Sequence, residues 1–272
     1  MSSSTDGMSM SSVDAMTRQA EDVLIVALDV NGQTEALALT HRLKDIGVKW
    51  VKVGMSLYYQ TGPALITTLR DQGFSVFVDL KLHDIPETVA RTTGVLVEAG
   101  ASFLNVHASG GLPMMQAAVE AAQTMADKTH QPMPTLLGVT VLTSTSQKLL
   151  AETLGIIRPL PELVSHLAQQ SQQAGCHGVV CSAQEAPILR AIPELSEPFL
   201  LVTPGIRPAS HTLGSDDQHR VLTPQKAIEA GSSMLVVGRP IYKAPEPEAV
   251  ARQMLDEIQS ALEKTSSKGA SV

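Results

Sequence analysis

The sequence predicts an α/β protein in which one domain, residues 22–262, closes into a (β/α)8 barrel, the TIM barrel fold. Short apolar segments of strand length alternate eight times with segments whose apolar residues recur at helical spacing. Most strand segments are apolar throughout, which is typical of parallel strands buried on both faces. Eight repeats favour a closed barrel over an open doubly wound sheet, and no Gly-x-Gly-x-x-Gly dinucleotide motif follows the first strand.

The first half of the chain supplies four pairs of a strand and a helix. The strands are expected at residues 23–28, 50–53, 75–78 and 103–106. The helices are expected within residues 36–46, 57–69, 89–99 and 114–126. Gly47, Gly73 and Gly100 end three of these helices, because glycine readily adopts the backbone conformation that follows a helix.

The second half repeats this pattern. Its strands are expected at residues 135–142, 178–180, 199–202 and 234–237, and its helices at residues 163–174, 184–190, 224–230 and 250–262. Residues 144–160 show no clear period, and residues 203–220 form a polar loop whose length is typical of a functional segment. The Ser/Met-rich residues 1–21 are expected to be a disordered extension, and residues 263–272 a frayed C-terminal tail.

Composition narrows the class of protein. A net charge of -7 and a pI of about 5.6 argue against a general nucleic-acid-binding or anionic-membrane surface. Cys176 and Cys181 match neither a disulfide framework nor a zinc site, which indicates a reduced, cytoplasmic protein. The first twenty or so residues lack the features of a secretory signal, and no apolar run reaches the roughly 18 residues of a membrane span.

The most informative stretch is residues 77–88, where a buried strand turns abruptly polar. Asp79 and Lys81 lie two positions apart, so they point to the same side of an extended backbone. Asp84 falls where the next helix begins. Such a cluster couples the pKa values of its members, as in sites that donate protons or stabilise charge. An ordinary helix start and a structural ion pair are the alternative interpretation.

Other polar residues are expected at the same rim, because the active site of such a barrel lies at the carboxyl ends of its strands. These residues are Asp29, Lys52, His107, Thr143, Arg207 and Arg239. Asp29 and Lys52 add a second pair of opposite charges, which suggests an alternating Lys-Asp-Lys-Asp array.

The end of the eighth strand points to a phosphate site. Gly238 lets the backbone approach a ligand closely, and the loops after strands seven and eight recurrently bind phosphate in this fold. Arg239 can then act as a bidentate donor, although a solvated surface arginine is the alternative. Arg207 and Gln218, from the long loop, are placed to close over the ligand, and Gln218 alone would be incidental.

Together these motifs resemble the orotidine 5'-phosphate decarboxylase family, in its single-function bacterial form, over roughly residues 22–262. They occur in the family's order, at residues 26–29, 51–54, 79–88, 105–111, 139–144, 180–185, 202–208 and 237–240. The Asp-x-Lys-x-x-Asp core at residues 79–84 is shared with related sugar-phosphate enzymes, whereas the whole set is specific. The N-terminal extension and the connection at residues 129–134 depart from the family pattern without touching a motif.

The resemblance implies decarboxylation of orotidine monophosphate to uridine monophosphate, without a metal or an organic cofactor. Lys81 would protonate the ring carbon, and Asp79 would face the departing carboxylate. The ribose hydroxyls would be held by Asp29, Lys52 and, from the partner subunit of a homodimer, Thr88. The remaining implied contacts are Asp84 from that same partner, Thr143 to the pyrimidine, and Arg207, Gln218, Gly238 and Arg239 to the phosphate.

Two other functions fit parts of the pattern. A metal-dependent sugar-phosphate lyase or aldolase of the same barrel group would carry a carboxylate near the end of strand two, where this chain has Lys52, a poor magnesium ligand. A catalytically silent, phosphate-binding scaffold is the other alternative. Such a scaffold would keep an intact array of charges that serves no reaction, although the array is costly for the stability of the fold.

Overall fold

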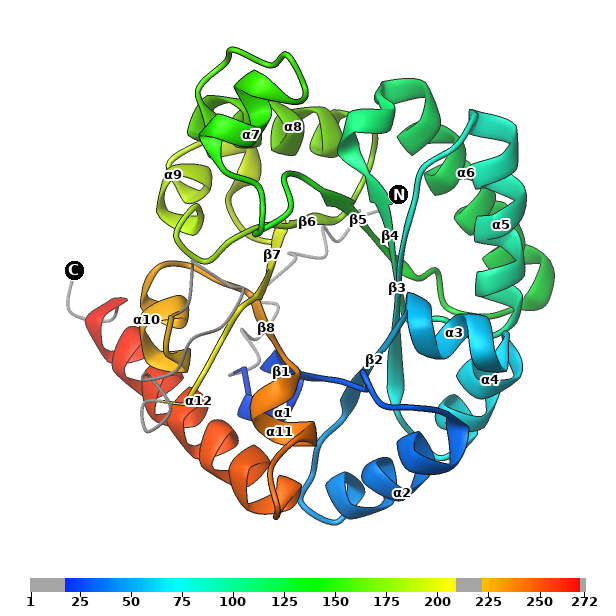
Figure 1. Cartoon of the computed structure of the whole chain (residues 1–272), viewed down its shortest axis with the longest axis vertical. Coiled ribbons are helices and arrows are strands. Elements are labelled where there is room, and N and C mark those ends of the chain that lie inside the picture. The colour runs from blue at the N-terminus through cyan, green and yellow to red at the C-terminus, as the bar shows by residue number, and fades with distance from the viewer. Residues whose placement is uncertain (1–17, 209–221, 270–272) are drawn as a thin grey trace, which may run out of the picture.

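The computed structural model describes residues 18–208 and 222–269, which form a closed barrel of eight parallel strands (Figure 1). Neighbours in the chain are neighbours in the barrel, and β8 pairs with β1 to close it. The strands are β1 (Leu24–Ala27), β2 (Trp50–Gly54), β3 (Ser75–Leu82), β4 (Phe103–His107), β5 (Thr135–Val139), β6 (Gly178–Val180), β7 (Leu200–Pro204) and β8 (Met234–Val237). The predicted fold class is therefore confirmed.

Helices surround the barrel as an outer layer (Figure 1). The main ones are α2 (Gln33–Lys44), α4 (Ala64–Asp71), α5 (Pro86–Glu98), α6 (Leu112–Thr129), α8 (Leu160–Gln173), α9 (Ala186–Arg190), α10 (Pro224–Glu229) and α12 (Pro247–Gly269). Shorter ones are α1 (Ala20–Val23), α3 (Met55–Thr61), α7 (Gln147–Glu152), α11 (Arg239–Tyr242), η1 (Ala108–Gly110) and η2 (Pro193–Leu195). Within the described residues, no helix combines the length and the apolar character needed to cross a membrane.

The inside of the barrel is filled by a small apolar cluster of its own, separate from the layer between strands and helices. Its buried members are Ile25, Ala27, Phe77, Phe103, Leu137, Val202, Met234 and Val236. Phe103 packs against Trp50 and Phe77, with ring centroids 4.4 and 5.9 Å apart. Because side chains alternate along a strand, the next inward positions after Trp50 and Phe77 are Lys52 and Asp79. The apolar cluster inside the barrel thus ends where the charged side chains begin.

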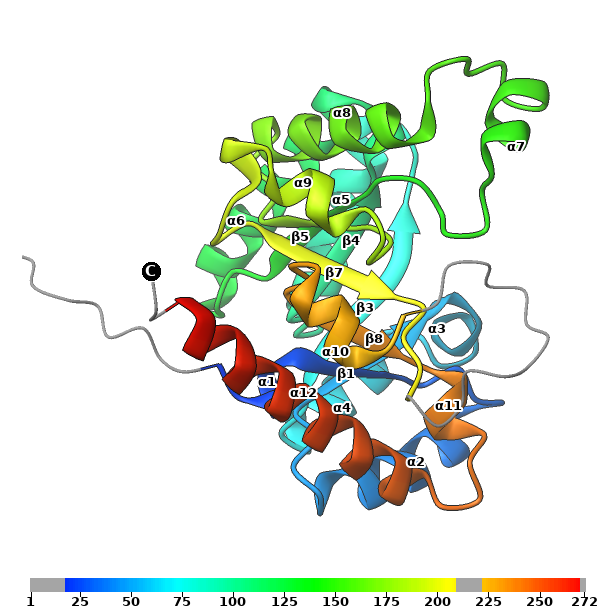
Figure 2. The ribbon, with the colours of Figure 1, turned by 90° about the vertical axis from the view of Figure 1, so that its left-hand side faces the viewer.

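Some boundaries differ from the prediction. The helix expected within residues 57–69 is two helices, α3 and α4, because Gly62 adopts a φ of 64° and Pro63 cannot donate a backbone hydrogen bond. Strand β5 ends at Val139 rather than at residue 142. The segment of residues 144–160 contains the short helix α7, which stands out from the barrel at the end toward which the β7 arrow points (Figure 2).

The expected boundaries of the domain also shift. Residues 18–21 fall within the predicted disordered extension, but the guanidinium of Arg18 donates to the carbonyl of Ser233, and Ala20 is buried at the start of α1. The tail expected from residue 263 is helical up to Gly269, since no proline or glycine interrupts it earlier. Residues 1–17 and 270–272 lie outside the described residues.

Candidate active site

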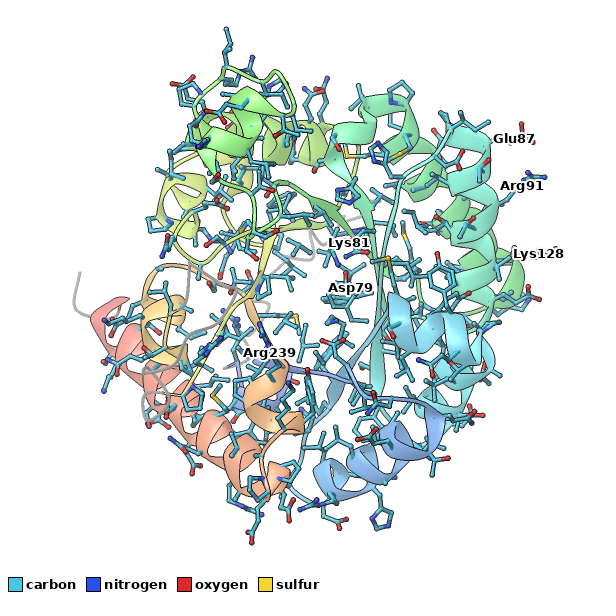
Figure 3. The ribbon with its side chains drawn as sticks, viewed as in Figure 1. Asp79, Lys81, Glu87, Arg91, Lys128 and Arg239 are labelled. Carbon is cyan, nitrogen blue, oxygen red and sulfur yellow. The ribbon has the colours of Figure 1, made fainter. Side chains whose placement is uncertain are left out.

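Four of the predicted residues form a continuous row of alternating charges, called here the charged row: Asp29, Lys52, Asp79 and Lys81. Lys52 Nζ lies 3.3 Å from Asp29 Oδ1 and 3.2 Å from Asp79 Oδ2. Lys81 Nζ lies 2.6 Å from Asp79 Oδ1. Asp79 and Lys81 project from β3 into the barrel opening, whereas Glu87, on α5, points outward (Figure 3). The structure thus brings these four predicted residues into contact, whereas Asp84 is not part of the row.

Pairing with opposite charges keeps Asp79 and Lys52 ionised although both are buried. Burial alone would raise the pKa of Asp79, but the ammonium groups of Lys52 and Lys81 outweigh it, and with a hydrogen bond from Asn105 they lower this pKa to about 2. Burial alone would likewise lower the pKa of Lys52, but Asp79 and Asp29 outweigh it and raise that pKa. At neutral pH the cavity wall therefore presents a fixed carboxylate between two ammonium groups.

Asn105 is a residue of this site that the sequence motifs did not single out. It is 1% exposed, on β4, and its Nδ2 donates to Asp79 Oδ1 over 2.7 Å. Its Oδ1 accepts the backbone N–H of Lys81 over 2.8 Å. In the sequence it appears only as the first residue of the motif at residues 105–111 and as a carboxamide inside the apolar run of residues 103–106, with no role assigned. A buried polar side chain of this kind needs partners, which are here two members of the charged row.

The charged row forms one wall of a cavity of about 340 Å³ at the barrel mouth. Thr143, Arg207 and Arg239 also line it, as predicted, and Arg239 comes from α11, at the end of β8 (Figure 3). Gly238 lies at the base of α11, where a Cβ atom would sit 3.6 Å from Asp29 Oδ2. The cavity thus joins the charges of β1 to β3 with arginines that follow β7 and β8.

Gly54 is a second residue whose contribution the sequence did not reveal. A Cβ atom at this position would lie 3.1 Å from Asp29 Oδ1 and 3.3 Å from Lys52 Nζ. The glycine therefore leaves the room in which these two side chains meet. It was visible in the sequence only as part of the motif at residues 51–54.

Three predicted site residues are not brought to this cavity by the described chain. Asp84 is exposed at the start of α5, where its Oδ1 accepts the backbone N–H of Ile85 over 2.6 Å. Thr88 lies one turn further along α5, and neither residue lines the cavity. Gln218 lies outside the described residues.

Fold and site together define a (β/α)8-barrel protein whose mouth combines a row of alternating charges with two arginines. A phosphate can be held by the arginines after β7 and β8, at the recurrent phosphate position of the fold, while the charged row faces the rest of the ligand. A comparison with family models identifies which such barrel it is. The chain belongs to the Orotidine 5'-phosphate decarboxylase / HUMPS family, whose model matches residues 22–254.

Individual relatives agree with this assignment. A protein of Synechococcus sp. (strain WH7803) named orotidine 5'-phosphate decarboxylase is 48% identical over 228 residues, which cover 84% of this chain and 91% of the relative. The protein of that name from Carboxydothermus hydrogenoformans is 45% identical over 239 residues, or 88% of this chain and 97% of the relative. A crystal structure of orotidine 5'-phosphate decarboxylase from Lactobacillus acidophilus superposes with a TM-score of 0.75 at 37% identity, and the match covers 87% of this chain and 99% of that one.

Proposed function

We propose that this chain decarboxylates orotidine 5'-phosphate to uridine 5'-phosphate, the last step of de novo pyrimidine synthesis. Membership of the family and the names of its relatives support this reaction. The observation that carries the proposal is the contact of Lys52, Asp79 and Lys81 along one wall of the mouth cavity. This wall offers the two things that the reaction needs, a fixed positive charge and a proton.

Lys81 is assigned the chemical step. When the bond between the ring and its carboxylate breaks, carbon dioxide leaves and the electron pair stays on the ring carbon. The ammonium of Lys81 stabilises this developing charge and then transfers a proton to the carbon. Its side chain is 25% exposed, compared with 10% for Lys52, so water can return the lost proton. Lys81 is thus the more accessible of the two ammonium groups.

Asp79 is assigned a different task, which depends on its staying ionised. Its pKa of about 2 means that it is a carboxylate at any pH near neutrality. Placed against the carboxylate of the substrate, it disfavours the bound substrate relative to the transition state, in which that charge moves into the ring. Lys52, in contact with Asp79 and Asp29, holds this arrangement together.

The rest of the ligand is assigned to the remaining residues around the cavity. Asp29 is half exposed, which leaves its carboxylate accessible for the ribose hydroxyls beside Lys52. Thr143, which also lines the cavity, is assigned the pyrimidine. The phosphate is assigned to Arg207, Gln218, Gly238 and Arg239. Binding energy from this distant group can hold the ring against the charged row, although the phosphate takes no part in the chemistry.

The active form is proposed to be a homodimer in which Asp84 and Thr88 complete the partner's site. Two observations support this. Asp84 is exposed and does not line the cavity of its own chain. Beside it, Ile85 is 65% exposed, and a large apolar side chain next to an exposed carboxylate suits a subunit contact.

The direct test is a spectrophotometric assay on orotidine 5'-phosphate with a metal chelator present. The expected result is loss of substrate absorbance at an unchanged rate with and without the chelator. No turnover would overturn the proposed function. Turnover that the chelator abolishes would favour metal-dependent chemistry over the charged row.

The shared site can be tested separately by mixing two inactive homodimers, Lys81→Ala and Asp84→Asn. A hybrid dimer has one site with both substitutions and one intact site. Random exchange should therefore restore roughly a quarter of the wild-type activity, because a two-fold dimer makes each contact twice. Lack of recovery, in a mixture shown to exchange subunits, would mean that Asp84 acts within its own chain or not at all.

A further inference from the structure

Asn105 lies behind the charged row rather than in the cavity. It is the third residue of β4, 1% exposed, and is not among the residues that line the cavity. It therefore cannot touch a ligand there. Both ends of its carboxamide are nevertheless engaged by members of the row: Nδ2 by Asp79 Oδ1 at 2.7 Å, and Oδ1 by the backbone N–H of Lys81 at 2.8 Å.

The backbone around Lys81 explains why a side chain is needed there. The pairing of β3 with β4 is regular at Phe77 and Val78 and resumes at Leu82 only after a shift of register. Within this irregular stretch Lys81 has a φ of 52°, a left-handed conformation that is unfavourable for a residue with a Cβ atom. The backbone N–H of Lys81 bonds to the side chain of Asn105 instead of to a strand carbonyl. This contact fixes the backbone from which the Lys81 side chain departs.

We propose that Asn105 is a positioning residue of the decarboxylation, which fixes Lys81 and Asp79 relative to each other and keeps Asp79 charged while Lys81 gives up its proton. The inference rests on the proposed function. Asp79 Oδ1 is shared by Lys81 Nζ, at 2.6 Å, and Asn105 Nδ2. When the proton moves from Lys81 Nζ to the ring carbon, the oxygen loses a charged donor but keeps the amide donor.

A carboxamide satisfies both requirements at this position. Its N–H donates to a carboxylate and its carbonyl accepts from a backbone N–H, with no charge of its own. Aspartate at position 105 would still accept the backbone N–H of Lys81. It would, however, place a second carboxylate beside that of Asp79 in place of the N–H donor. Leucine has nearly the same shape and neither function. The substitutions Asn105→Asp and Asn105→Leu therefore separate the two roles.

Thr140 provides a matched control. It is 5% exposed just after β5, and its hydroxyl donates to the carbonyl of Val180 over 3.2 Å, on the neighbouring strand. Thr140→Val removes one side-chain hydrogen bond from the barrel, and Thr140 makes no hydrogen bond to the charged row. A purely structural role for Asn105 would make its variants behave like this control.

The experiment measures kcat and KM on orotidine 5'-phosphate, the affinity for uridine 5'-phosphate by calorimetry, the pH dependence of kcat/KM, and thermal unfolding. Asn105→Leu should lower kcat by about 100-fold, as small misplacements of reacting groups do, with KM and product affinity little changed. Asn105→Asp should also move the acidic limb of kcat/KM to higher pH, because two adjacent carboxylates retain a proton. Thr140→Val should lower the thermal stability and leave the kinetics, the product affinity and the pH dependence unchanged.

Wild-type kinetics in a folded Asn105→Leu variant would overturn the inference. If that variant does not fold, Asn105→Asp decides, and an unchanged kcat together with an unchanged pH profile would equally overturn it. An inactive wild-type protein would instead remove the proposed function, and with it the reaction in which Asn105 is placed. The two failures are therefore distinguishable.

Discussion

The cations at the two ends of the barrel are held by different kinds of partner. At the amino end, Arg190 is surrounded by neutral oxygens. Its guanidinium donates over 2.7 to 3.0 Å to the carbonyls of Leu195, Phe199 and Gly231 and to the hydroxyl of Ser233. At the carboxyl end, Lys52 and Lys81 are held by carboxylates instead.

The difference indicates what each end does. The donors of Arg190 tie together the segments that lead into β7 and β8, so the charge serves the fold. The mouth contains as many carboxylates as ammonium groups, and the members of the row line an open cavity. Such a balanced set is expensive to bury, which favours a role beyond stability. A charged ligand can reach the row through the cavity, whereas the oxygens around Arg190 are occupied by its guanidinium.

Lys81→Ala should have the largest effect of the changes considered. The mouth would lose both its proton donor and the charge that stabilises the ring carbanion, so kcat should fall by at least about 1,000-fold. Binding of uridine 5'-phosphate, measured by calorimetry, should persist because the phosphate contacts are untouched. The control is Lys49→Ala, which removes an exposed lysine paired with Asp22 at 2.8 Å. Appreciable decarboxylation by the Lys81 variant would exclude the assigned role.

Arg190→Leu, at the amino end, should lower the stability of the protein and leave catalysis unchanged. Four buried or half-buried oxygens would lose their donor, and the free energy of unfolding should fall by about 3 kcal/mol. The kcat of the folded fraction should stay at the wild-type value, since none of the hydrogen-bond partners of Arg190 belongs to the charged row. Urea titration followed by activity measurements on the folded protein checks both. Arg42→Leu, which breaks an exposed ion pair with Glu248, should change the free energy of unfolding far less, because solvent screens such pairs.

The sequence predicted the charged row because two simple rules were sufficient. Residues two apart on a strand share a side, and parallel strands of a barrel end at one rim, which brings Lys52 to Asp79 and Lys81. Asn105 was not foreseen, because its contacts depend on the irregular pairing of β3 with β4, which arises only when the two strands meet. The position of Asp84 depends on a second chain, so one chain leaves that prediction untested.

Local chemistry explains the other differences from the prediction. Helix α7 lacks an apolar period, yet Ser146 caps it by accepting the N–H of Leu149 over 3.2 Å. The break between α3 and α4 follows from the Gly62–Pro63 pair, whose effect outweighs the apolar spacing of the residues around it. Capping and breaking residues, which act at single positions, are therefore more decisive here than periodicity.

Arg239→Ala tests the side of the cavity to which the phosphate is assigned. Loss of one charged donor to the phosphate should raise KM and lower kcat/KM by about 100-fold in total, because remote binding energy is lost. The charged row itself should stay intact, so the pH profile of kcat should match that of the wild type. Steady-state kinetics across pH provide both quantities. Unchanged kinetics would remove the phosphate assignment of Arg239.

The smallest expected effect is a difference between the two ends in how the free energy of unfolding depends on pH. The pKa of Asp79 is lowered from 3.8 to about 2, so its ionised form stabilises the fold above pH 3.8, and this contribution, on the order of 2 kcal/mol, disappears as the pH falls through 2. The stability gap between wild type and Asp79→Asn, from urea titrations between pH 6 and 2, should therefore narrow with acid. The gap for Arg190→Leu should change less, because its hydrogen-bond partners are carbonyls and a hydroxyl, which do not titrate, and the carboxylate of Glu197 acts on it only through space. Parallel behaviour of the two gaps would mean that the mouth charges are held no differently from the one at the amino end.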